Sequence, residues 1–148
     1  MTPKKITAGF LAATLAVGVP VSGFAADLHS FADAPTPSHW SYTAVNYAVD
    51  EDLLKGLGEN LGLNHPLTRA QMAAVAVRLL NLSGGAGINF SDVPNDAWYA
   101  PAVKTAAHHG LISGVGNNLM NPNANISREA VFSIFARIIQ NTEADAAI

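Results

Sequence analysis

Two arginines of the chain stand immediately inside the start of a predicted helix, where anion binding is favoured. Arg69 follows Thr68, and Arg128 follows Ser127. The first turn of a helix has unsatisfied backbone N–H groups and the positive end of the helix dipole, so it attracts negative charge. A guanidinium at the same place adds planar donors that fit a carboxylate. A cation there otherwise opposes the dipole, at a cost of roughly a few tenths of a kcal/mol. We therefore expect both arginines to have an anionic partner.

Each arginine opens a segment with the period of an amphipathic helix, at residues 67–80 and 126–139. Thr68 and Gln71 form a predicted capping box, in which each side chain binds a free N–H of the first turn. Ser127 is the predicted cap of the second segment. Apolar residues then recur at the i, i+3, i+4, i+7 spacing of a buried face. They are Met72, Val75, Ala76, Leu79 and Leu80, and then Val131, Ile134, Phe135, Ile138 and Ile139.

Both segments close a duplicated unit, which covers residues 31–81 and again residues 90–140. Trp40 aligns with Trp98 at an offset of 58 residues, and a one-residue difference in the next loop moves later pairs to 59. In each unit a first helix follows the tryptophan, an irregular loop rich in Gly and Asn comes next, and the second helix ends the unit. The sequence thus predicts an all-α fold made of two helix–loop–helix units.

The first 25 residues have the order of a secretory signal peptide. Lys4 and Lys5 precede an apolar run at about residues 8–21, and small residues lead to Ala25, after which we expect cleavage. The run is shorter than the ~20 residues that cross a bilayer, which makes an uncleaved anchor helix the less favoured alternative. The predicted order is signal peptide (1–25), first unit (26–82), glycine-rich linker (83–89), second unit (90–140) and tail (141–148).

Charge and cysteine content limit the classes of function. The chain has eight Lys and Arg, eleven Asp and Glu, and no cysteine. Loss of the signal removes two basic residues and no acidic one, which leaves a net charge of −5 and disfavours nucleic acid as a partner. Without cysteine the fold depends on its apolar core. No later segment is apolar for long enough to span a membrane, so we expect the mature chain to be soluble once exported.

The ordered pattern of each unit resembles the S-layer homology (SLH) domain. The pattern is F-x-D, a tryptophan, a helix of small apolar residues, a G-x-G loop and a helix that begins with Leu or Ile, Thr or Ser, and Arg. The resemblance implies tandem repeats packed around a pseudo-symmetric axis, usually three, of which this chain has two. It also implies a secreted protein of the bacterial cell wall, S-layer or cell envelope, held non-covalently by a secondary cell-wall polysaccharide that is often pyruvylated.

The resemblance further implies four pairs of residues that bind the polymer. An arginine would bind the carboxylate of a pyruvyl ketal, a tryptophan would cover a sugar face, an aspartate would accept hydroxyls, and a glycine would let the loop backbone approach. The predicted polysaccharide-binding residues are Arg69, Arg128, Trp40, Trp98, Asp33, Asp92, Gly56 and Gly114. The sequence also allows a structural role for these residues: either tryptophan could belong to the core, and either aspartate could cap a turn.

The sequence indicates no catalysis, metal site or cofactor. The G-x-G loops lack the third glycine and the βαβ setting of a dinucleotide site, and the adjacent His108 and His109 point apart on a helix. No nucleophile elbow or convincing carboxylate pair is present. A structural or protein–protein module that pairs with other SLH chains, without sugar, is the alternative function. Because two units leave an open side where three usually close, we expect a homo-oligomer or pairing with another SLH protein.

Overall fold

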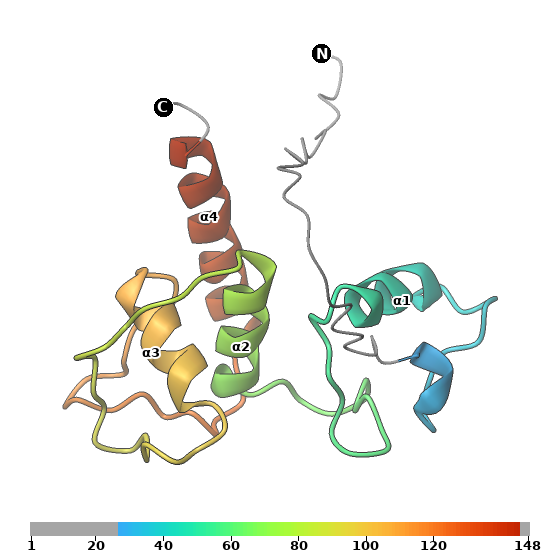
Figure 1. The fold of residues 1–148 in the computed structure, drawn as a ribbon, viewed down its shortest axis with the longest axis horizontal. Coiled ribbons are helices and arrows are strands. Elements are labelled where there is room, and N and C mark those ends of the chain that lie inside the picture. Colours follow the sequence, from blue (N-terminus) through green and yellow to red (C-terminus); the bar gives the residue numbers. More distant parts are fainter. Residues whose placement is uncertain (1–26, 146–148) are drawn as a thin grey trace, which may run out of the picture.

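The structure, a computed structural model, describes residues 27–145, which form helices joined by ordered loops (Figure 1). The helices are η1 (Leu28–Ser30, a 3₁₀ helix), α1 (Tyr42–Asp50), α2 (Arg69–Leu79), α3 (Ala100–His108) and α4 (Arg128–Asp145). Among these residues, β interactions are limited to isolated bridges, two of which lie in the equivalent loops of the two units. The all-α prediction is confirmed. The predicted signal peptide and its cleavage after Ala25 lie outside the described residues.

The second helix of each unit begins where the sequence predicts. The Thr68 hydroxyl accepts a hydrogen bond from the Gln71 N–H at 3.2 Å, and the Gln71 side chain accepts one from the Thr68 N–H at 2.8 Å, so the capping box of α2 is present. At α4, the Ser127 hydroxyl accepts from the Ala130 N–H at 3.2 Å. Helix α4 continues to Asp145, inside the segment that the sequence predicts as a tail.

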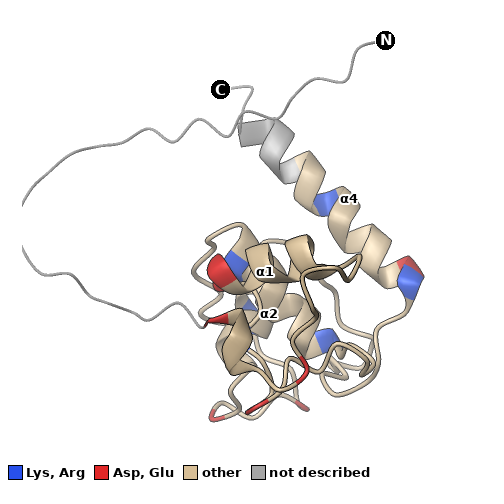
Figure 2. Ribbon diagram, turned by 90° about the vertical axis from the view of Figure 1, so that its right-hand side faces the viewer, with Lys and Arg blue, Asp and Glu red and all other residues tan. Residues whose placement is uncertain are grey.

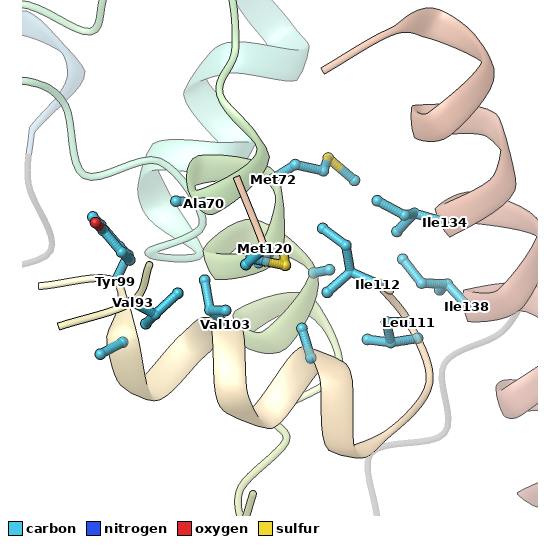
Figure 3. Close-up of a cluster of buried hydrophobic side chains, with 14 residues drawn as sticks. Ala70, Met72, Val93, Tyr99, Val103, Leu111, Ile112, Met120, Ile134 and Ile138 are labelled. Atoms are coloured by element: carbon cyan, nitrogen blue, oxygen red, sulfur yellow. The ribbon is translucent and has the colours of Figure 1, made fainter. Parts of the chain in front are cut away.

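The main hydrophobic core combines elements of both units. Helix α2 of the first unit packs against α3 of the second, and Figure 3 shows Ile134 and Ile138 of α4 directed toward Leu111 and Ile112. The buried members are Ala70, Met72, Ala73, Ala76, Val93, Tyr99, Ala100, Val103, Ala106, Leu111, Ile112, Met120, Ile134 and Ile138. Small side chains on α2 and α3 allow the two helices to approach closely. A helix of the first unit therefore completes the core of the second unit.

A smaller core holds the first helix of the first unit. It consists of Leu28, Phe31, Val45, Val49 and Leu61, and α1 packs against η1. Among the described elements, no α-helix packs against α1, which lies apart from α2, α3 and α4 in Figure 1. The units of the sequence are therefore not the units of packing.

Part of each predicted apolar stripe is exposed. Leu79 of α2 and Phe135 and Ile139 of α4 are exposed, contrary to the prediction, whereas Ala70 and Ala73 are buried. The helical period identifies an apolar face but not the element that will cover it. In α2 the covered face is the one that meets α3, and this face is made mainly of alanine.

Candidate functional site

A hollow of about 440 Å³, the first groove, lies between the loop of the first unit and α2, and Trp98 of the second unit also lines it. Three basic side chains line this groove, namely Lys55, His65 and Arg78, whereas none of the acidic residues that the structure describes does so. Leucine side chains of the loop and Val75 make much of the remaining wall. The groove thus offers positive charge to an anion and an apolar wall to a sugar ring.

Neighbouring groups position two of these basic side chains, Arg78 and Lys55. Arg78 donates from Nη1 to the Leu53 carbonyl oxygen at 3.0 Å, which holds the guanidinium over the loop. Lys55 forms an ion pair with Asp52 at 2.6 Å, and both side chains are more than half exposed. An exposed pair of this kind contributes little to stability, so the Lys55 ammonium can exchange this partner for an incoming anion.

A second groove, of about 310 Å³, occupies the equivalent place in the second unit, between its loop and α4. Arg137 donates from Nη1 to the Leu111 carbonyl oxygen at 3.0 Å, which repeats the bond from Arg78 in the first unit. Arg69 and Glu129 also line this groove, and none of the described tryptophans does. The second groove therefore has Arg137 as the equivalent of Arg78, but it lacks the tryptophan that lines the first groove.

Arg69 is bound mainly to backbone carbonyl groups. Its Nε donates to the Met120 oxygen at 2.9 Å, and its Nη2 donates to the Ser113 oxygen at 2.6 Å. The side chain is half-buried, and this burial lowers the pKa of Arg69 from its ordinary value while the charge of Asp92 opposes the shift. The guanidinium thus ties the start of α2 to the loop of the second unit, which leaves only its remaining N–H groups for a ligand.

Arg128 has the equivalent sequence position but a different environment. It is exposed, and its guanidinium carbon lies 5.9 Å from the centroid of the Phe132 ring, a cation–π distance. It lines a hollow of about 220 Å³ together with Leu67 and Ile126. In the part of the chain that the structure describes, no hydrogen bond or ion pair holds the Arg128 guanidinium. The two predicted arginines therefore do not share a groove.

The two predicted aspartates hold the loops in place. The Asp33 carboxylate accepts hydrogen bonds from the successive N–H groups of residues 61–62 at 2.5 and 2.8 Å. The Asp92 carboxylate accepts the equivalent bonds from residues 120–121 at 2.8 and 2.7 Å. Each aspartate therefore fixes the loop that borders the groove of its own unit, in agreement with the turn-capping alternative.

These contacts change the acidity of both carboxyl groups. The hydrogen bond from Leu61 is the main reason why the pKa of Asp33 lies below its ordinary value. Burial by itself would raise the pKa of Asp92, but hydrogen bonds from Met120 and Asn121, together with the charge of Arg69, outweigh it and lower the pKa. Both aspartates are therefore held in the charged form.

Neither tryptophan is part of the core. Trp40 is 89% exposed and Trp98 is 63% exposed, and each lies in the turn before the first helix of its unit. Tyr99 packs edge-on against Trp98, with 5.4 Å between ring centroids. The core alternative is therefore wrong for both residues, and of the two only Trp98 lines the first groove.

The paired glycines make room for an aromatic ring of their own unit. A side chain at Gly56 would collide with the Phe31 ring, and one at Gly114 would come within 3.0 Å of Phe90 and 2.7 Å of the Leu119 carbonyl oxygen. Gly56 also has a φ of 74°, which other residues rarely adopt. The fold thus needs both glycines, and Gly56 lines the first groove as well.

The structure brings together only part of the predicted site. Gly56 and Trp98 line the first groove, Arg69 lines the second, and Arg128 and Trp40 line neither. The groove residues that sequence reasoning missed are Lys55, His65 and Arg78. The recurrence of an arginine at positions 78 and 137 was the available signal, because both copies make the same bond to a loop carbonyl group.

Residues 27–145 contain neither a metal-binding cluster nor a membrane-spanning helix. Within this range, no group of three or more His, Asp or Glu side chains is placed to hold a metal ion. In the same range, no helix has both the length and the apolar character that a membrane span needs. Charged residues are scattered over the helices and loops (Figure 2).

Comparison with known proteins identifies the repeated unit. The sequence profile of the S-layer homology domain matches residues 33–73 and 89–132. The chain is 34% identical to an exoglucanase, XynX, of Acetivibrio thermocellus over 101 residues, which are 67% of this chain and 9% of that protein. It is 28% identical to a surface-layer 125 kDa protein of Lysinibacillus sphaericus over 132 residues, which are 88% of this chain and 11% of that protein. It is also 25% identical to the middle cell wall protein of Brevibacillus brevis over 142 residues.

The chain thus spans about a tenth of the length of XynX and of the surface-layer 125 kDa protein. The shared part is the repeated module, so the enzymatic name of a relative such as XynX describes other parts of that longer protein.

Proposed function

Because the chain belongs to the S-layer homology domain family, whose modules anchor proteins to the bacterial cell wall, we propose that its first groove binds a secondary cell-wall polysaccharide through a pyruvylated sugar. Membership in this family also assigns the chain to the cell envelope. Anchoring needs no catalytic group, and we propose no enzymatic activity for the chain.

The observation that carries the proposal is the composition of the first groove. Lys55 and Arg78 are within one hollow with the exposed ring of Trp98, and no described acidic side chain lines it. A pyruvyl ketal combines a carboxylate with an apolar sugar face, so a single residue of such a polymer would use both features. The net charge of −5 that we expect for the exported chain gives no long-range attraction to an anionic polymer, so these local cations must provide the affinity.

The other predicted site residues have secondary roles in this proposal. Asp33 and Gly56 shape the loop that forms one wall of the groove. Arg69 is proposed to contact the polymer at the second groove with the N–H groups that the backbone carbonyls leave free. Arg128 is exposed and could add a further contact only where the polymer passes the start of α4.

Co-sedimentation with purified wall sacculi tests the polymer as ligand. We expect the chain to sediment with intact sacculi and to remain in solution once the non-peptidoglycan polymer has been stripped. Binding that survives stripping would contradict the proposal and would favour the alternative of a module that pairs with other proteins of the wall.

Two pairs of variants test the groove itself. Lys55→Gln should weaken binding at least about tenfold, because a charge-assisted hydrogen bond contributes about 1.5–3 kcal/mol. Lys104→Gln is the matched control, since Lys104 is bound to Asn95 at 2.6 Å and lies outside both grooves. Trp98→Ala should also weaken binding, whereas Trp40→Ala should have little effect on binding by the monomeric chain, because Trp40 does not line the first groove. Equal binding by Lys55→Gln, Trp98→Ala and the parent would contradict the assignment of this groove.

A further inference from the structure

The contact between α2 and α3 is the main interface between the two units. Ala73 and Ala76 of α2 are buried there in one cluster with Val103 and Ala106 of α3. The main core depends on this contact, because α2 also contributes Met72 to the same cluster. The chain therefore contains one complete copy of a helix pairing in which the second helix of one unit covers the first helix of the next.

Helix α4 carries a second copy of the α2 face. Alignment of the units places Phe132 and Phe135 at the positions of Ala73 and Ala76. Phe132 is 62% exposed and Phe135 is 44% exposed, whereas both alanines are buried. Figure 2 shows α4 extending away from the other helices. The face that α2 uses for packing is therefore open on α4.

Helix α1 carries the second copy of the α3 face. Tyr47 is 61% exposed, whereas Thr105, its equivalent in α3, is 6% exposed. Ala44 is exposed, whereas its equivalent Ala102 is half-buried beside α2. Among the described elements, α1 packs against η1 alone. Helices α1 and α4 thus each present one half of an interface. The complete form of this interface is the contact between α2 and α3.

The groups that form polar contacts at the start of α2 have equivalents elsewhere in the chain that do not form these contacts. The Arg69 side chain donates to the carbonyl oxygens of Ser113 and Met120, and the Arg69 N–H donates to that of Ala124 at 3.0 Å. Arg128 makes no equivalent bond within the described residues. The carbonyl groups that correspond to these acceptors in the first unit belong to Lys55, Leu61 and His65.

Charge at the two faces is complementary. Asp92 lies near Arg69, whose charge helps to lower the pKa of Asp92. Asp33 occupies the same place in the first unit, and no basic side chain of the described residues has this effect on it. A guanidinium docked beside Asp33 in the position of Arg69 would therefore meet a fixed carboxylate.

From these observations we infer that α4 of one copy of this chain docks on α1 of a second copy, in the way that α2 docks on α3 within the chain. Phe132 and Phe135 then pack against the small residues Ala44 and Ala48, and Arg128 reaches the loop of the second copy next to its Asp33. The contact is head-to-tail, so it either closes into a ring or continues as a filament.

Docking also completes the second groove. Trp98 lines the first groove because α3 packs against α2. When α1 of a second copy packs against α4 in the same way, its Trp40 lies at the second groove beside Arg137. The 89% exposure of Trp40 is then a property of the separate chain. This last step rests on the proposed polysaccharide function, whereas the docking itself does not.

Sedimentation velocity of the purified exported chain, from about 1 to about 100 µM, tests the docking in the absence of any sugar. We expect association that increases with concentration. Phe135→Asp, which alters the α4 face, should weaken association at least about tenfold, because it introduces a charge into an apolar contact. Ala44→Glu combined with Tyr47→Glu should do the same through the α1 face. Val115→Asp is the control, because Val115 is similarly exposed but lies in the loop of the second unit, to which Arg69 of α2 is already bound.

Mixing the two kinds of variant distinguishes head-to-tail docking from other association. A chain with Phe135→Asp retains its α1 face, and the Ala44→Glu, Tyr47→Glu chain retains its α4 face. A mixture should therefore form a 1:1 complex at concentrations at which neither variant associates alone. Arg128→Ala, which leaves both apolar faces intact, should also weaken association. A parent chain that stays monomeric, or a mixture that forms no complex, would overturn the inference. Wall binding by a monomeric chain through the first groove would leave the proposed function standing.

Discussion

We predict that replacing Arg69 with alanine destabilises the fold, whereas the equivalent replacement of Arg128 does not. Arg69 is half-buried and donates two hydrogen bonds, at 2.9 and 2.6 Å, to the carbonyl oxygens of Met120 and Ser113. A hydrogen bond from a charged group contributes about 1.5–3 kcal/mol when it is shielded from water. Because the site is only partly buried, water can replace part of this contribution. We therefore expect Arg69→Ala to lower the free energy of unfolding by about 2 kcal/mol.

Thermal unfolding followed by circular dichroism, on protein dilute enough to be monomeric, measures the effect. A loss of this size corresponds to a decrease in Tm of about 8 °C for a domain of this length. Arg69→Lys should lose roughly half as much, because a lysine keeps the charge near Asp92 but cannot reach both carbonyl groups. Arg128→Ala should change the stability by less than about 0.5 kcal/mol, since among residues 27–145 its guanidinium interacts only with the exposed Phe132 ring. Equal Tm values for Arg69→Ala and Arg128→Ala would refute the assignment of Arg69 as a tie between the units.

Three further predictions concern the loops, the core and export. The pKa values of Asp33 and Asp92 are lowered in the folded state, so both contribute stability above the ordinary aspartate pKa of about 3.9 and lose it as the pH falls below that value. Either Asp→Asn variant should therefore be less stable than the parent at neutral pH. On acidification, urea unfolding should show that the free energy of unfolding decreases less for the variant than for the parent. Leu111→Ala should cost about 2–5 kcal/mol because Leu111 is fully buried, whereas Leu53→Ala, at the equivalent half-buried position, should cost clearly less. Mass spectrometry of the exported protein should find an N-terminus directly after Ala25, and a chain that still begins at Met1 would identify the segment as an anchor.

The elements that depend on local sequence could be predicted well. Thr68 and Gln71 define the start of α2 because a capping box needs only residues three positions apart, and both of its bonds are present. The duplication could also be predicted from the sequence. In the structure the two loops repeat the same aspartate and glycine contacts. Neither feature requires knowledge of how distant parts of the chain meet.

The partner of each helix could not be predicted from the same patterns. The apolar period of α2 predicts a buried face, but α1 and α3 are both suitable neighbours by composition. The structure selects α3, which leaves Tyr47 of α1 exposed and buries Thr105 of α3. The first groove follows from this choice, because Trp98 lines it from the second unit. Its basic residues were missed because Lys55 and Arg78 are distant in sequence and converge only once the loop has folded onto α2.

Equivalent residues of the two units have the same contacts at some positions and different contacts at others. Asp33 and Asp92 form the same bonds because the backbone N–H groups that donate to them lie within their own units, so the environment is duplicated with the sequence. Arg69 and Arg128 differ because the contacts of Arg69 lie in the next unit, and within the described residues Arg128 has no next unit to contact. A role can therefore be transferred between repeats only where the neighbour is repeated as well. The exposed faces of α1 and α4 follow the same rule, and a second copy of the chain is the neighbour that would restore the equivalence.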